Sequence, residues 1–166
     1  AALAALHHQH LGHGLVVKSL RERSEAVGRP IQLGITLNLT NAVPNDPSDP
    51  VDLEAARRVD ALWNRAFLDP ILRGEYPADL LQDVAGLGLA EVIQDGDLET
   101  IGQTIDFLGV NHYHDDNVSG HAVPIDAEAE REGKPTDRPT SSSLVGSEYV
   151  SFPSRNLPRT AMGWEV

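Results

Sequence analysis

The stretch Ile105-Asp-Phe-Leu-Gly-Val-Asn-His-Tyr113 carries the clearest strand signal in the chain. Its run of apolar residues is typical of a strand that is buried on both faces, as in a parallel sheet. A second strand is predicted over residues 31–39, where apolar side chains stand at every second position: Ile31, Leu33, Ile35, Leu37 and Leu39. These two strands decide the fold class.

Helical patterns precede and separate the two strands. Apolar residues recur at helical spacing over residues 1–23, and Gly28-Arg29-Pro30 ends that pattern. A second helix is predicted over residues 51–67, with Asp49 as its N-cap and Pro50 at its first position, where the missing N–H costs nothing.

The second helix is expected to break or kink at Asp69-Pro70, because proline disfavours the helical region for the residue before it. Shorter helices are predicted over residues 78–85 and 98–102. The order is helix, strand, helix, strand, with helices long enough to cross between parallel strands. This order predicts an α/β architecture.

The chain is too short for a complete parallel barrel. It has 166 residues, whereas an eightfold β/α barrel typically needs about 250, and two strands do not make a stable parallel sheet alone. Residues 122–147 are rich in Ala, Glu, Pro, Thr and Ser and lack periodicity, so we expect a long flexible loop there.

The composition excludes several classes of function. The net charge is −12 and the thirteen basic residues are scattered, which argues against nucleic acid or an anionic membrane as a partner. The chain has no cysteine, so a disulfide framework and a thiolate zinc site are excluded. No stretch approaches the length of a membrane span and no signal peptide is visible, so we expect a cytoplasmic protein. The chain opens inside a helical pattern without Met, as a section of a longer protein would.

Five stretches together resemble family 1 glycoside hydrolases, in the order that this family uses them. They are Ala5-Leu-His-His-Gln-His-Leu-Gly-His-Gly14, Leu33-Gly-Ile-Thr-Leu-Asn-Leu39, Phe67-Leu-Asp-Pro-Ile-Leu-Arg-Gly-Glu-Tyr-Pro77, Ile105–Tyr113 and Thr160-Ala-Met-Gly-Trp-Glu-Val166. The resemblance implies an incomplete part of a TIM barrel, from about the fourth helix through the sixth strand. It also implies a retaining β-glucosidase that needs no metal or cofactor and acts on a β-glucoside or an oligosaccharide.

Retaining glycosidases need two carboxyl groups about 5–5.5 Å apart, one as the nucleophile and one as the acid/base. Family members carry these groups in an Asn-Glu-Pro motif before this section and a Glu-Asn-Gly motif after it. Neither string occurs in the chain. We therefore expect no catalytic residue in this chain and no activity from the chain alone.

The resemblance implies a supporting site instead. Asn111 and Tyr113 would point into the barrel, with the Tyr113 hydroxyl bonded to the nucleophile carboxylate and stabilising its charged form. Asn38 would line the leaving-group side, and Trp164 would offer a flat surface to a sugar. Structural explanations stand beside these roles: Tyr113 as the end of a strand, Asn38 as a turn residue and Trp164 as a core residue.

The histidines of the first predicted helix are a possible metal site. His10 and His13 lie three residues apart, His7 and His8 are adjacent, and no pair has the i, i+4 spacing of a zinc protease helix. Most of them match family positions that hold histidine without a metal. We therefore expect core or interface histidines and no metal ligand.

Two further functions are open at this stage. A phospho-β-glycosidase of the same family is possible, although Met162 argues against it by resemblance. From a different class, the chain could be a non-catalytic module that binds carbohydrate or a protein partner through a partial barrel. Because exposed parallel strand edges invite pairing with another chain, we expect self-association or association with the remainder of a barrel.

Overall fold

The computed structural model describes residues 2–112, 115–121, 139–140 and 152–153. These residues form two compact units. Unit 1 contains residues 2–39 and 61–111, and unit 2 contains residues 40–60 together with the described residues from 112 onward. The two units are taken in turn below.

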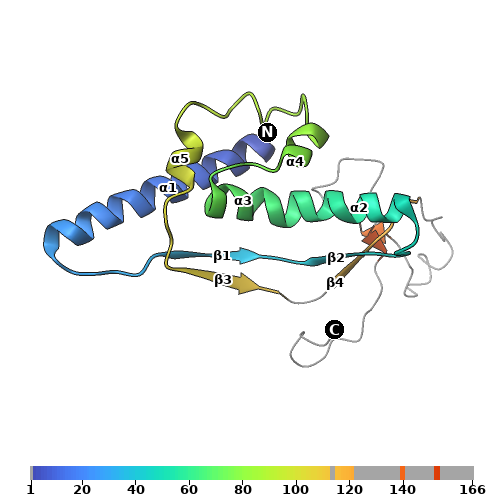
Figure 1. Cartoon of the computed structure of the whole chain (residues 1–166), viewed down its shortest axis with the longest axis horizontal. Coiled ribbons are helices and arrows are strands. Elements are labelled where there is room, and N and C mark those ends of the chain that lie inside the picture. Colours follow the sequence, from blue (N-terminus) through green and yellow to red (C-terminus); the bar gives the residue numbers. More distant parts are fainter. Residues whose placement is uncertain (1, 113–114, 122–138, 141–151, 154–166) are drawn as a thin grey trace, which may run out of the picture. The chain divides into compact units, whose positions relative to one another are not determined.

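Unit 1 is built on two parallel strands, β1 (Gly34–Asn38) and β3 (Phe107–Asn111). Figure 1 shows them side by side and running in the same direction. Their register pairs Gly34 with Phe107 and ends with Asn38 opposite Asn111. Both predicted strands are therefore confirmed, although each is shorter than the sequence pattern indicated.

The expectation that the second strand is buried on both faces was wrong for the described residues. Phe107 and Val110 are 53% and 46% exposed. One-sided cover explains Phe107: Ile35, Leu37 and Leu108 belong to a hydrophobic core, whereas alternation places Phe107, Gly109 and Asn111 on the opposite face. Val110 shares the face of Leu108 but is not part of that core.

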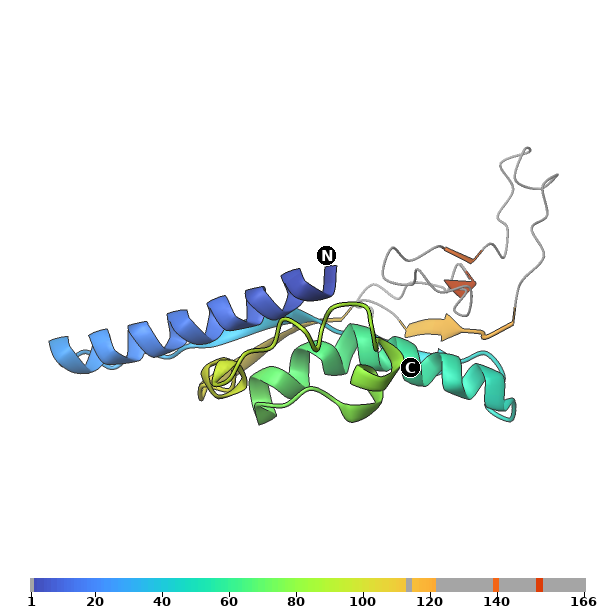
Figure 2. The same ribbon diagram turned by 90° about the horizontal axis from the view of Figure 1, so that it is seen from above.

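Unit 1 contains five helical segments. They are α1 (Ala2–Val27), the π-helical turn η1 (Ala61–Arg65), α3 (Ala66–Arg73), α4 (Ala78–Asp83) and α5 (Asp97–Ile101), and α1, α3 and α5 cover one face of the strand pair. Figure 1 shows α1, α3 and α5 on one side of β1 and β3, and Figure 2 shows α1 running along the strands when seen from above. Ile71 of α3 and Ile101 of α5 belong to the same hydrophobic core as Leu37, and Leu11 of α1 packs against that core.

Two helix ends test the sequence predictions. The first helix ends at Val27, and Gly28 follows with a φ of 64°, as the Gly-Arg-Pro stop predicted. The sequence predicted a break or a kink at Asp69-Pro70; the helix does not break there, because α3 continues to Arg73 and ends at Gly74 in the left-handed conformation. Pro70 is fully buried, so tertiary packing outweighs the lost backbone hydrogen bond at this position.

Unit 2 has a smaller core. The strands β2 (Asn41–Pro44) and β4 (Asp115–Val118) pair in parallel, and α2 (Pro50–Asp60) packs on them through Ala55, Ala56 and Val59. A short antiparallel pair, β5 (Pro139–Thr140) and β6 (Phe152–Pro153), belongs to the same unit. The predicted loop over residues 122–147 lies almost entirely outside the described residues.

The predicted start of the second helix is confirmed. The helix begins at Pro50, and the backbone N–H of Val51 donates to the Asp49 carboxylate at 2.8 Å. This side-chain oxygen satisfies one of the backbone donors that a helix start leaves free.

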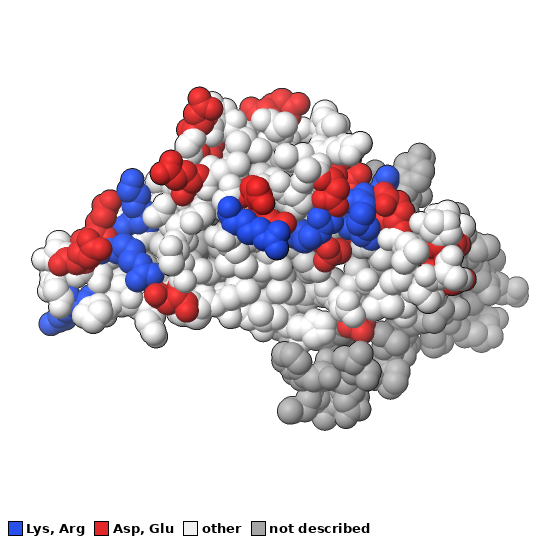
Figure 3. All heavy atoms as spheres, viewed as in Figure 1, with Lys and Arg blue, Asp and Glu red and all other residues white. Residues whose placement is uncertain are grey.

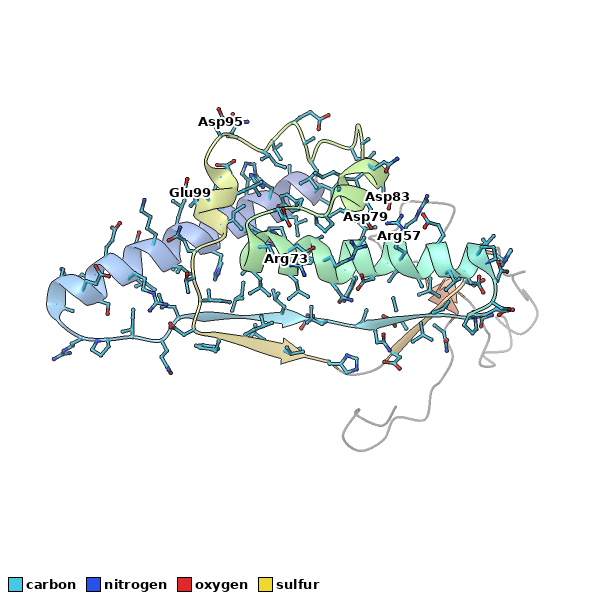
Figure 4. The ribbon with its side chains drawn as sticks, in the orientation of Figure 1. Arg57, Arg73, Asp79, Asp83, Asp95 and Glu99 are labelled. Carbon is cyan, nitrogen blue, oxygen red and sulfur yellow. The ribbon has the colours of Figure 1, made fainter. Side chains whose placement is uncertain are left out.

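Acidic and basic side chains are mixed on the surface. Figure 3 shows Lys and Arg beside Asp and Glu on the same face. In unit 1, Arg65 makes two parallel hydrogen bonds of 2.8 and 2.6 Å to Asp79, which is labelled in Figure 4. Within the described part of the chain, no helix has the length and apolar character to cross a membrane.

The contact between α1 and α5 requires glycine at position 14. A Cβ atom there would lie against the backbone of Thr100 and within 2.9 Å of the Ile101 Cα. These are main-chain atoms that cannot turn aside as a flexible side chain can. The two helices would therefore have to separate if the residue carried a side chain.

We predict that Gly14→Ala lowers the free energy of unfolding by about 1–3 kcal/mol, the usual range for overpacking. The matched control is Gly12→Ala on the same helix, where nothing lies within 4 Å of the new Cβ. That variant should gain up to about 1 kcal/mol because alanine is the better helix former. Urea unfolding of both variants checks the prediction, and equal stabilities would contradict it.

Candidate functional site

The two predicted asparagines lie together in unit 1. Asn38 ends β1, Asn111 ends β3, and the strand register places them opposite one another. The Asn111 Nδ2 donates to the Asn38 Oδ1 at 2.9 Å. Both side chains are exposed at the carboxyl ends of parallel strands, which is where α/β folds place their ligand sites.

The remaining predicted site residues lie outside the described part of the chain. Tyr113 and Trp164 belong to the stretches 113–114 and 154–166. Their expected functions, orientation of a nucleophile and stacking on a sugar, therefore stay predictions.

Two of the α1 histidines, His7 and His10, lie in the core of unit 1, as expected, whereas His8 is exposed. The His7 Nε2 lies 2.9 Å from the Asp97 carboxylate, and its Nδ1 lies 3.2 Å from the Tyr76 hydroxyl. The His10 Nδ1 lies 3.3 Å from the same hydroxyl. One assignment of protons satisfies all three contacts: His7 donates to Asp97, Tyr76 donates to His7, and His10 donates to Tyr76.

Burial favours the neutral forms of His10 and Tyr76 in this network. Burial lowers the pKa of His10 to about 4, with smaller contributions from the neighbouring His7 and His13. Burial raises the pKa of Tyr76, and the charge of Asp97 acts in the same direction. The Nε2 atoms of His10 and His13 are buried without a hydrogen-bond partner among the described residues. Protonation at either nitrogen would place a charge in the core.

A third cluster, in unit 2, escaped the sequence analysis. The carboxylates of Asp49 and Asp52 and the imidazole of His121 place ligand-type atoms within 4.8 Å of one another. Asp49 was predicted only as a helix cap, and His121 stands 72 positions away in the sequence. No local pattern could have indicated that the two meet.

The hydrogen bonds of this cluster favour a structural function over a metal site. Buried Asp52 accepts from the Ser119 hydroxyl at 2.8 Å and from the backbone N–H groups of Gly120 and Asp46 at 2.9 and 3.0 Å. The His121 Nε2 lies 2.6 Å from Asp49, a contact that raises the pKa of His121. The carboxylates of Asp49 and Asp52 thus already accept hydrogen bonds from protein groups. They also lie at the N-terminal start of α2, where the helix dipole disfavours a bound cation. The cluster ties α2 to the segment after β4.

We predict that His10 makes the protein sensitive to acid. Its folded-state pKa lies below the ordinary value of 6.5, so the stability is complete above pH 6.5 and is lost as the pH falls toward 4. The loss approaches about 3 kcal/mol, from about 1.4 kcal/mol for each pH unit. His10→Phe removes the titrating group and should flatten this part of the profile, measured by urea unfolding between pH 4 and 7.

The matched control for that experiment is His8→Gln, at an exposed position two residues away. It should keep the acid sensitivity of the parent chain. An unchanged profile in His10→Phe would show that other groups cause the acid loss.

Comparisons with known proteins place this chain in a family. The model of "Glycosyl hydrolase family 1" matches residues 1–166. The crystal structure of the psychrophilic beta-glucosidase BglU from Micrococcus antarcticus is 71% identical with a TM-score of 0.79, over 99% of this chain and 34% of that one.

Curated relatives agree with that match. The thermostable beta-glucosidase B of Thermobispora bispora is 44% identical over 138 residues, which are 82% of this chain and 27% of that protein. The bifunctional beta-D-glucosidase/beta-D-fucosidase of Bifidobacterium breve is 35% identical over 99% of this chain and 32% of its own length. The chain thus spans about a third or less of these relatives. It belongs to glycosyl hydrolase family 1, whose fold is a TIM barrel.

Proposed function

We propose that this chain is the central section of a retaining β-glucosidase, from the fourth helix through the sixth strand of the barrel. The observation that carries the proposal is the 71% identity, over 99% of the chain, to a structure named as a beta-glucosidase. The parallel pairing of β1 with β3 supports the same placement, because successive barrel strands are parallel neighbours. In the complete enzyme the reaction is the hydrolysis of terminal β-glucosides.

Bond cleavage in this enzyme depends on residues outside the section. Retention needs a nucleophile carboxylate and an acid/base carboxyl group, and the sequence contains neither an Asn-Glu-Pro nor a Glu-Asn-Gly motif. The section supplies the walls of the site: Asn38 and Asn111 at the strand ends, Tyr113 beside the nucleophile, and Trp164 against a sugar face. No metal or cofactor takes part in this mechanism.

We expect the isolated 166-residue chain to release no p-nitrophenol from p-nitrophenyl β-glucoside, because it lacks both carboxyl groups. The same section within the complete enzyme should be active, and this pair of assays under identical conditions checks the proposal. Turnover by the isolated chain that survives repeated purification would contradict it. An inactive complete enzyme would contradict the β-glucosidase assignment itself.

The function that the family resemblance implies for Tyr113 yields a second expectation. A hydroxyl that donates to the nucleophile carboxylate stabilises its charged form and lowers its pKa. In the complete enzyme, Tyr113→Phe should therefore lower kcat about 10-fold to 100-fold, the size expected for a lost hydrogen bond to a charged group. The acidic limb of the kcat/KM profile should also move to higher pH. A fall in activity without that movement would assign Tyr113 a purely structural function.

A further inference from the structure

Two segments of unit 2, each of which follows a parallel strand, are joined by one buried carboxylate. Asp52, in the first turn of α2, is 2% exposed. Its Oδ1 accepts from the Ser119 hydroxyl at 2.8 Å and from the Gly120 N–H at 2.9 Å, after β4. Its Oδ2 accepts from the Asp46 N–H at 3.0 Å, after β2. Because a carboxylate accepts on both oxygens and an amide on only one, Asp52 can hold both segments at once.

The segment after β4 lies directly on the start of α2. A Cβ atom at Gly120 would lie 2.6 Å from the Val51 carbonyl oxygen and 2.7 Å from the Val51 Cγ1. The next residue, His121, donates its backbone N–H to the Ser119 Oγ at 3.2 Å. The hydrogen bonds to Asp52 therefore also fix the backbone of His121 beside the start of α2.

The His121 side chain adds a second tie, and this one is open to solvent. Its Nε2 lies 2.6 Å from the Asp49 Oδ2, while the Asp49 Oδ1 accepts from the Val51 N–H as the cap of α2. The His121 side chain is 55% exposed. A proton can thus reach and leave the imidazole while unit 2 stays folded.

The charges beside His121 favour its protonated form. The hydrogen bond to Asp49 raises the pKa of His121, and the negative charges of Asp49 and Asp52 act in the same direction. The dipole of α2 acts against a positive charge at this end of the helix. Asp46, the other acidic residue of the loop before α2, accepts from the Ser48 N–H and hydroxyl. Burial opposes the charge of Asp52, but its hydrogen bonds lower its pKa overall, so Asp52 stays charged while His121 titrates.

We propose that His121, Asp49 and Asp52 form a pH-responsive clasp between the segment after β4 and the start of α2. Asp52 is the part that stays closed, and the pair of His121 with Asp49 is the part that titrates. Because the folded-state pKa of His121 lies above 6.5, the contribution of this pair is complete below pH 6.5 and is lost as the pH rises through the raised value. The segment is therefore held most firmly in mildly acidic solution and loosens in alkaline solution.

Hydrogen–deuterium exchange of the complete enzyme tests the clasp, read by mass spectrometry on a peptide that contains residues 119–121. Each exchange rate is divided by the intrinsic rate at the same pH, so that only the opening of the structure remains. The protection of this segment should fall about 2-fold to 5-fold between pH 6 and 9, the size expected for an exposed ion pair. Peptides from α1 should keep their protection over this range, because His10 is already neutral there.

Two variants assign the pH dependence to the pair. His121→Gln retains a side-chain N–H for Asp49 but cannot become charged, so the protection should stay at the parent's alkaline level at every pH. Asp49→Asn caps α2 about as well as Asp but removes the charge, so the fall should become smaller and move to lower pH. The matched control is His112→Gln, which removes a histidine that lies 3.8 Å from another carboxylate of unit 2, that of Asp115. It should leave the pH profile unchanged.

A third variant tests the buried anchor. Asp52→Asn has one acceptor oxygen for two segments, so the protection of Asp46 or of residues 119–120 should fall at every pH. Parent-like protection of both segments in this variant would overturn the anchor.

The clasp itself is overturned by protection that stays constant between pH 6 and 9 in the parent, or by the same fall in His121→Gln. These outcomes do not depend on whether Asp52→Asn folds, because His121→Gln changes an exposed side chain. The exchange is measured without substrate, so its result is also separate from the proposed β-glucosidase function.

Discussion

The parallel register of β1 with β3 is the constraint on which the rest of unit 1 depends. It sets Leu37 and its neighbours toward the helices and leaves Asn38 and Asn111 together on the other face. Because side chains alternate along a strand, a slip of one residue would exchange these two faces. The hydrophobic contacts with α3 and α5 therefore hold the two amides in place, although they touch neither of them. Core packing and site geometry are consequences of one register.

The helices that pack on this strand pair are held by apolar contacts and by a buried network of polar side chains. His7, Tyr76 and Asp97 join α1 to segments 69 and 90 residues away in the sequence. Buried polar groups are tolerated when they are hydrogen-bonded and costly when they are not. Within the part of the chain that the structure describes, the buried Nε2 atoms of His10 and His13 have no hydrogen-bond partner. They destabilise the core when they are protonated, so the core depends on neutral forms of these two histidines. Gly14 adds a steric requirement, because α1 can approach the backbone of Thr100 this closely only if residue 14 has no side chain.

In the proposed function, the residues that cleave the glycosidic bond and the residues that line the site come from segments of the barrel that are far apart in the sequence. The proposed function assigns the two bond-breaking carboxyl groups to other segments and the walls of the site to this one. Such a division suits a parallel barrel, because every strand delivers its carboxyl end to the same face. Residues that position or bind a sugar can then come from one section, and residues that react with it from another.

The sequence by itself determined the α/β class, the two strands, the helix start at Asp49-Pro50 and the helix stop at Gly28. Each of these depends on neighbours along the chain, so a local pattern is sufficient. The ordered motifs also determined the family, since five matches in sequence order leave little room for chance. Only the tertiary structure decided that α3 continues through Pro70, that His121 meets Asp49 and that Asn111 donates to Asn38. Burial and long-range pairing control these features, and they arise only when segments distant in the sequence are packed together.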